Sequence, residues 1–154
     1  MLKVGETAPE FCLLNEEKQE ICLSKFKGKW IVLYFYPKDQ SPGCTHEACD
    51  FTDNYKAFSD LNSVIIGISA DSPESHLKFI QKKDLSIILL SDEKLDVIES
   101  YQAKNTSLLG KLILPVKRVT YIINPEGKIA KTWSKVNVFG HSQDVKNSLL
   151  ELQN

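Results

Sequence analysis

Four apolar runs divide the chain and predict the strands of a buried sheet. Each run is rich in β-branched and aromatic residues and is apolar at both odd and even positions, as a parallel strand covered on both faces is. Segments with helical periodicity lie between the first three runs, so the sequence predicts an α/β protein with a central sheet flanked by helices. The runs are residues 29–36, 63–70, 85–91 and 118–124.

Two hairpins are predicted to make this sheet mixed. After the fourth run, the turn sequence PEGK at 125–128 leads into another apolar stretch at 129–134, which indicates an antiparallel pair. Near the N-terminus, the polar stretch LNEEKQEI lies between short apolar pieces and predicts an N-terminal β-hairpin.

Capping signals and apolar periodicity together predict four helices. Serine–proline pairs at 41–42 and 72–73 each place serine at the N-cap and proline at the first helical position. Periodic apolar residues predict two more helices, at 92–102 and 142–153. The last of these is expected to bury Val145, Leu149 and Leu152.

The helix after Ser41 has one apolar face, formed by residues spaced four and three apart. Cys49 lies five residues beyond Cys44, and at ~100° per residue it projects away from this face, towards the more solvated side. The residues expected on the face are Cys44, Ala48, Phe51, Tyr55 and Phe58.

Length and charge narrow the possible functions. A chain of 154 residues is expected to form one domain, residues 1–154. The 19 basic and 20 acidic residues are scattered, so the sequence indicates neither a nucleic-acid nor a membrane partner. No apolar segment approaches the ~20 residues that a membrane span needs, and the N-terminus does not resemble a signal peptide, so we expect a cytoplasmic protein.

The four cysteines are not expected to form a structural disulfide framework. Their spacing is uneven, and such frameworks are rare in a reducing compartment. Cys12 and Cys22 lie within the predicted N-terminal hairpin and are interpreted as small packing residues.

Cys44 is the candidate nucleophile, because the unpaired N–H groups at a helix start stabilise a thiolate. An inert, buried cysteine is the first alternative. A zinc site is the second, since Cys44 and Cys49 flank His46, although a structural site needs four ligands. A thioredoxin-type oxidoreductase is the third, but it requires a C-x-x-C motif where this chain has C-x4-C.

The segment YPKDQSPGCTHEACDF resembles the active-site segment of the peroxiredoxins, whose pattern is P-x-x-x-[ST]-x-x-C. Pro37, Ser41 and Cys44 match this pattern. Cys49 matches the second cysteine of the bacterioferritin comigratory protein group, also called peroxiredoxin Q. The similarity extends over nearly the whole chain, from VGETAPEF to WSKVNVFGH.

This resemblance implies a thioredoxin-like fold and reduction of hydrogen peroxide or organic hydroperoxides. Cys44 would be the peroxidatic cysteine, Cys49 the resolving cysteine, and Arg118 the arginine that completes the pocket. An intramolecular disulfide between the two cysteines would be recycled by thioredoxin or a similar dithiol. No metal, flavin or nucleotide cofactor is implied, and the group's usual form suggests a monomer. A peroxide sensor or thiol-dependent binding protein that uses the same cysteine is the alternative.

The remaining positions near the motif are assigned smaller roles. Pro42 and Gly43 are expected to shape the pocket together with Pro37 and Ser41; serine here replaces the commoner threonine but keeps the hydroxyl. The loop at 103–117 is aliphatic where relatives often carry tryptophan, so it is expected to affect substrate preference. Two flanking residues, His46 and Glu47, are interpreted as solvated helix residues, and His141 is assigned no chemistry.

The spacing of Cys44 and Cys49 also predicts a local change of the helix when the two residues form a disulfide. Five residues of helix rise ~7.5 Å, which exceeds the ~7 Å limit on the Cα separation of a disulfide. We therefore expect the helix to unwind locally when the two cysteines join, with Gly43 easing the backbone change.

Overall fold

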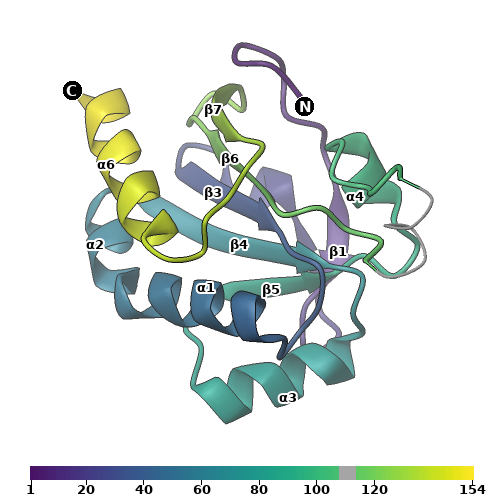
Figure 1. Cartoon of the computed structure of the whole chain (residues 1–154). Helices are drawn as coiled ribbons and strands as arrows, with labels where there is room; N and C mark the ends of the chain where they lie inside the picture. Colours follow the sequence, from purple (N-terminus) through teal and green to yellow (C-terminus); the bar gives the residue numbers. More distant parts are fainter. Residues whose placement is uncertain (108–113) are drawn as a thin grey trace.

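The computed structural model describes residues 1–107 and 114–154. In these ranges seven strands form one sheet in the order β2-β1-β5-β4-β3-β6-β7 (Figure 1). Both hairpins predicted from the sequence lie at its edges. The strands are β1 (Cys12–Leu14), β2 (Glu20–Cys22), β3 (Trp30–Phe35), β4 (Ser63–Ser69), β5 (Ile88–Ser91), β6 (Val119–Ile123) and β7 (Ile129–Trp133).

The sheet is mixed, as the sequence predicts. β3 pairs in parallel with β4, and β4 pairs in parallel with β5. β6 runs antiparallel to both β3 and β7. Because β3 lies between β4 and β6, the loop that leaves its carboxyl end is placed beside the residues that precede β6. This arrangement positions the candidate site.

Helices cover both faces of the sheet and bury two apolar clusters. Phe51, Phe58, Phe79 and Val145 pack with Val32 and other sheet residues on one face. Ile98 packs with Phe35 and other residues on the opposite face. The helices are α1 (Pro42–Asp53), α2 (Tyr55–Asp60), α3 (Pro73–Lys83), α4 (Asp96–Ser100) and α6 (His141–Gln153), with a 3-10 turn, η1, at Leu23–Phe26.

Three of the four helix predictions are wrong in part. The helix predicted at 92–102 is shorter in the structure, where only α4 is helical. The Leu95 backbone has the left-handed conformation, with φ 66°, so the helix begins only after this residue. The Asp92 carboxylate accepts the Ile98 N–H at 2.7 Å and so bonds to the first turn of α4 from outside it. Tyr55 is exposed rather than on the apolar face, because α1 ends at Asp53 and α2 starts in a new phase. Leu152 is also exposed, since it lies in the last turn of α6 beyond the sheet contact.

The interpretation of Cys12 and Cys22 as small packing residues is wrong. The two residues are directly opposite each other in β1 and β2, and a disulfide joins them. Cys12 is exposed and Cys22 is half-buried. The antiparallel register, which brings the side chains of opposed residues together, is the physical reason for the bond.

No helix in residues 1–107 or 114–154 is long and apolar enough to cross a membrane. Residues 108–113 of the loop expected to affect substrate preference lie outside the described residues.

Candidate active site

Cys44 occupies the first turn of α1, as the sequence predicts. Ser41 is the N-cap with extended backbone angles, Pro42 is the first helical residue, and Thr45 N–H donates to Ser41 O at 2.8 Å. The Cys44 side chain is buried, with 1% of its surface exposed, and its thiol is free. A sulfur in this position lies beside the unpaired N–H groups at the positive end of the helix, which stabilise an anion.

Arg118 meets this sulfur from the residue before β6. Its Nη2 donates to Cys44 Sγ at 3.3 Å, although the two residues are 74 positions apart in the sequence. The Arg118 side chain is only 21% exposed, so the charge of its guanidinium is less screened than it would be in water. A positive charge at this distance stabilises negative charge on the sulfur.

Glycine at position 43 allows this approach. A Cβ atom at Gly43 would lie 3.2 Å from Arg118 Nη2, tighter than an ordinary carbon contact. Glycine at this position therefore leaves room for the guanidinium, and the role of Gly43 in shaping the pocket stays a prediction.

Glu47 is part of the site, so its interpretation as a solvated residue is wrong. It lies three residues after Cys44 on the same face of α1, is 1% exposed, and accepts Arg118 Nη1–H at 2.7 Å on Oε1. Burial raises the pKa of Glu47 to about 7, while Arg118 limits the rise. This carboxylate anchors one side of the guanidinium fork and leaves the other side for Cys44.

Cys49 lies on the same regular helix but in a different environment. It is half-buried, and this burial raises the pKa of its thiol. α1 continues through both cysteines to Asp53, and both thiols are free. The structure therefore has the dithiol form of the pair, with the helix intact.

The loop from Pro37 to Ser41 carries the remaining motif residues into place. Pro37 and Gly43 are half-buried and Pro42 is exposed. The Ser41 hydroxyl does not cap α1: its Oγ donates to Lys38 O at 2.9 Å, across the turn of the loop. The Ser41 hydroxyl thus supports the loop in this structure.

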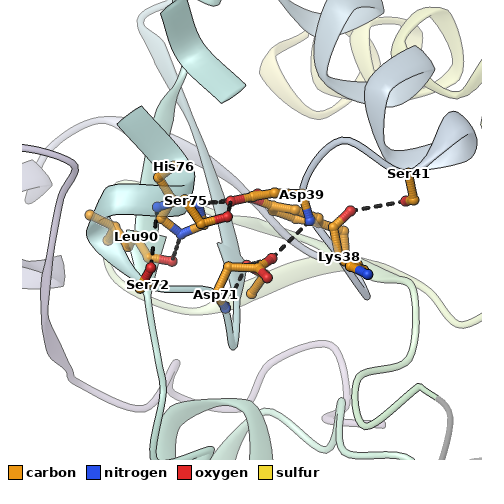
Figure 2. A network of polar contacts seen from close by, with 10 residues as sticks. Lys38, Asp39, Ser41, Asp71, Ser72, Ser75, His76 and Leu90 are labelled. Carbon is orange, nitrogen blue, oxygen red and sulfur yellow. Dashed lines mark hydrogen bonds and ion pairs between the residues drawn. The ribbon is translucent and has the colours of Figure 1, made fainter. Parts of the chain in front are cut away.

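A buried polar network fixes the same loop to the sheet and α3 (Figure 2). The Asp39 N–H donates to Asp71 Oδ2 at 2.8 Å. The Asp39 carboxylate accepts the Tyr36 hydroxyl at 2.6 Å and the Ser75 hydroxyl at 2.8 Å. The bonds to Asp71 and Ser75 reach distant parts of the chain, and the bond to Tyr36 joins Asp39 to the residue that follows β3, so several elements together determine the position of Asp39.

His76 completes this network from α3. Its Nδ1 lies 2.7 Å from Asp39 Oδ2, and its Nε2–H donates to Leu90 O at 3.0 Å at the end of β5. The ring is fully buried. Asp39 and His76 could not be predicted from local sequence patterns, because their contact joins positions 37 residues apart.

The other two histidines near the motif do not join the Cys44 cluster. His46 is exposed and its ring packs against that of Phe139 in a tilted arrangement, with ring centroids 4.5 Å apart. His141 is buried, with Nε2 2.8 Å from Thr120 Oγ1, and burial lowers its pKa to about 4. Among the described residues, Cys44, His46 and Cys49 of the zinc alternative do not form a cluster with metal-ligand spacing. The atoms of Cys12, Glu20 and Cys22 lie within 4.8 Å of one another, but the two cysteine sulfurs are already joined in a disulfide.

Comparison with known proteins agrees with this geometry. Residues 4–132 match the model of the AhpC/TSA family. Peroxiredoxin Bcp of Bacillus subtilis (strain 168) is 41% identical over 152 residues, which cover 98% of this chain and 97% of the relative. The chain belongs to the AhpC/TSA family and is a peroxiredoxin.

Solved structures of related peroxiredoxins have the same fold. The bacterioferritin comigratory protein of Xanthomonas campestris, described for its alkyl peroxide reduction activity, is 32% identical with a TM-score of 0.88, over 94% of this chain and 92% of that one. The peroxiredoxin Q of Xylella fastidiosa is 28% identical with a TM-score of 0.93, over 100% and 99% of the two chains. The thioredoxin-like fold is thereby confirmed, and this peroxiredoxin is a thiol peroxidase.

Proposed function

We propose that this peroxiredoxin reduces hydrogen peroxide and organic hydroperoxides through Cys44, resolves the product with Cys49, and is recycled by thioredoxin or a similar dithiol. The observation that carries the proposal is the contact between Arg118 Nη2 and Cys44 Sγ at the start of α1. It supports a thiolate held ready at a site where negative charge is stabilised by both a guanidinium and a helix N-terminus.

In the first step, the Cys44 thiolate attacks the terminal oxygen of ROOH. The S–O bond forms as the O–O bond breaks, and RO⁻ leaves and takes up a proton to give ROH. Arg118 is placed to stabilise charge on the breaking bond, since such donors contribute most where charge develops. Glu47 acts through Arg118, whose guanidinium it holds at 2.7 Å. Pro37, Pro42, Gly43 and Ser41 shape the pocket.

In the second step, the Cys49 thiol attacks the Cys44 sulfenic acid, and water leaves as the disulfide forms. An external dithiol then reduces this disulfide by exchange. Burial raises the pKa of the Cys49 thiol, which favours its neutral form while α1 is intact. We propose that the enzyme works as a monomer in the cytoplasm.

Replacing Cys49 by serine is expected to separate the two half-reactions. One equivalent of peroxide should still be consumed, and dimedone should trap a sulfenic acid on Cys44, because the attacking thiolate is unchanged. Thioredoxin-dependent turnover should fall sharply, because the resolving thiol is lost. Mass spectrometry of the trapped peptide and a coupled turnover assay measure the two effects.

The matched control is the double variant Cys12→Ser/Cys22→Ser, which removes the other two sulfurs. It is expected to consume peroxide and turn over as the unaltered protein does. Turnover of Cys49→Ser at the unaltered rate would assign resolution to a different thiol and overturn the proposed role of Cys49.

A further inference from the structure

We infer that the Cys12–Cys22 disulfide is a second redox site of this protein, which external dithiols reduce in the folded state. It lies in the N-terminal hairpin, and the peroxidase chemistry of Cys44 and Cys49 does not use it. The proposal concerns a separate pair of sulfurs and does not depend on the proposed steps at Cys44.

The strand register directs both sulfurs outward. The Leu23 N–H donates to Phe11 O at 3.0 Å, so the neighbouring pair, Cys12 and Cys22, is a non-hydrogen-bonded pair of the ladder. Side chains alternate along a strand, and Leu13 and Ile21 pack against the core. The two cysteines therefore point to the other side of the hairpin, where Cys12 is exposed.

A surface cavity beside Cys12 gives an incoming thiol access to the disulfide. The cavity has a volume of about 370 Å³ and lies between the hairpin and the segment that follows β5. Thiol–disulfide exchange requires attack on one sulfur of the disulfide, and the exposed residue Cys12 lines the cavity from which a thiolate would attack. The walls include Cys12, Leu14, Glu20, Glu93, Lys94 and Asp96.

The charges around this cavity are mainly negative and determine which thiols react well. Glu20, Glu93 and Asp96 are exposed on its walls, against the single exposed cation Lys94 among its lining residues. A carboxylate oxygen of Glu20 lies within 4.8 Å of both sulfurs. This charge repels an anionic thiol and attracts a cationic one, so the site favours neutral or basic dithiols.

The sheet keeps this site apart from Cys44. β5 and β4 lie between β1 and β3, the strand that leads into the Cys44 loop. At the usual strand spacing of ~4.8 Å, β1 and β3 are ~14 Å apart, too far for direct exchange between the two pairs. An external dithiol therefore has to reach each disulfide separately.

Reduction transfers two electrons and two protons from the external dithiol. The first thiolate of the dithiol attacks one protein sulfur and releases the other as a thiolate. Its second thiol, as a thiolate, then attacks the donor sulfur of this mixed disulfide and releases the remaining protein sulfur. The Cys12–Cys22 pair takes up two protons and becomes two thiols, and the donor becomes a disulfide. The hairpin is held to the rest of the sheet through one register pair, Leu14 with Ser91, so losing its cross-link should loosen β1 and β2 without unfolding the core.

The test uses the full-length variant Cys44→Ser/Cys49→Ser, in which Cys12 and Cys22 are the remaining cysteines. The native protein is treated with dithiothreitol and then with an alkylating reagent, and mass spectrometry counts the alkyl groups on each molecule. We expect two alkyl groups on the native protein, at residues 12 and 22. A disulfide that reacts only after denaturation in urea would overturn the inference.

A second experiment tests the charge preference with two monothiols, cationic cysteamine and anionic glutathione. For each thiol the rate of reduction of the Cys12–Cys22 disulfide is divided by the concentration of its thiolate form. Cysteamine should react faster at low salt, and the difference should shrink as salt is added. Glu20→Gln should raise the glutathione rate by ~2- to 5-fold, the size of an exposed charge interaction. Equal rates for the two thiols, or no effect of Glu20→Gln, would contradict the proposed selectivity.

Discussion

Replacing Cys44 by serine is expected to abolish peroxide reduction and to leave the fold intact. A serine hydroxyl does not ionise near neutral pH, so the variant lacks the nucleophile that attacks the O–O bond. The oxygen is slightly smaller than the sulfur it replaces, and the Cys44 site is a buried, well-packed position on α1, so the loss of packing is small. Peroxide consumption with a thiol reductant measures activity, and circular dichroism measures the fold.

The matched control is Cys49→Ser, the same chemical change on the same helix. It should still consume one equivalent of peroxide, whereas Cys44→Ser should consume none. If folded Cys44→Ser reduced peroxide at a rate near that of the unaltered protein, Cys44 would not be the nucleophile.

Replacing Arg118 by alanine is expected to lower the second-order rate with peroxide by ~10²- to 10³-fold, as the loss of one positioned transition-state donor does. The variant removes the donor to Cys44 Sγ and also leaves the buried Glu47 carboxylate without its cation. Stopped-flow measurement of single-turnover oxidation gives this rate without the later disulfide steps.

Arg118→Lys provides the comparison that separates charge from geometry. Lysine keeps the positive charge but cannot donate to Glu47 and Cys44 from one planar fork, so its rate should lie between the alanine variant and the unaltered protein. A rate for Arg118→Ala within a factor of a few of the unaltered rate would place the guanidinium outside the chemistry.

The strands were predictable because their signal is local. A run such as 63–70 is apolar on both faces wherever it occurs, and this pattern already requires cover on two sides. The run at 85–91 shows the limit of that signal: Leu85 and Ile87 are buried, yet pairing in β5 begins only at Ile88. The apolar composition of a segment predicts that it is buried. The residue at which strand pairing begins depends on the neighbouring strand, which the local sequence does not specify.

The candidate site was predictable in part, through the motif around Cys44. Glu47 was missed because a carboxylate in a helix is ordinarily solvated, although its spacing of three from Cys44 places it on the buried face. Its partner Arg118 is 71 residues away in the sequence, and no local pattern connects them.

The Cys12–Cys22 bond had a usable signal that the sequence analysis did not use. Both cysteines lie five residues from Glu17 in the middle of the predicted hairpin, so a symmetric register would place them opposite each other. Register is set by turn geometry, and a shift of one residue would have turned the two side chains to different faces.

We propose that Cys44 and Cys49 form a disulfide by local unwinding of α1. Hydrogen–deuterium exchange of residues 42–53, compared between the reduced protein and the protein oxidised by one equivalent of peroxide, tests it most directly. Five residues of helix separate the cysteines by ~7.5 Å along the axis, so the bond requires the helix to open. We predict high protection in the reduced form and a marked loss of protection across both cysteines in the disulfide form. Equal protection of residues 42–53 in the two forms, with the Cys44–Cys49 bond confirmed by peptide mapping, would contradict the proposed unwinding of α1.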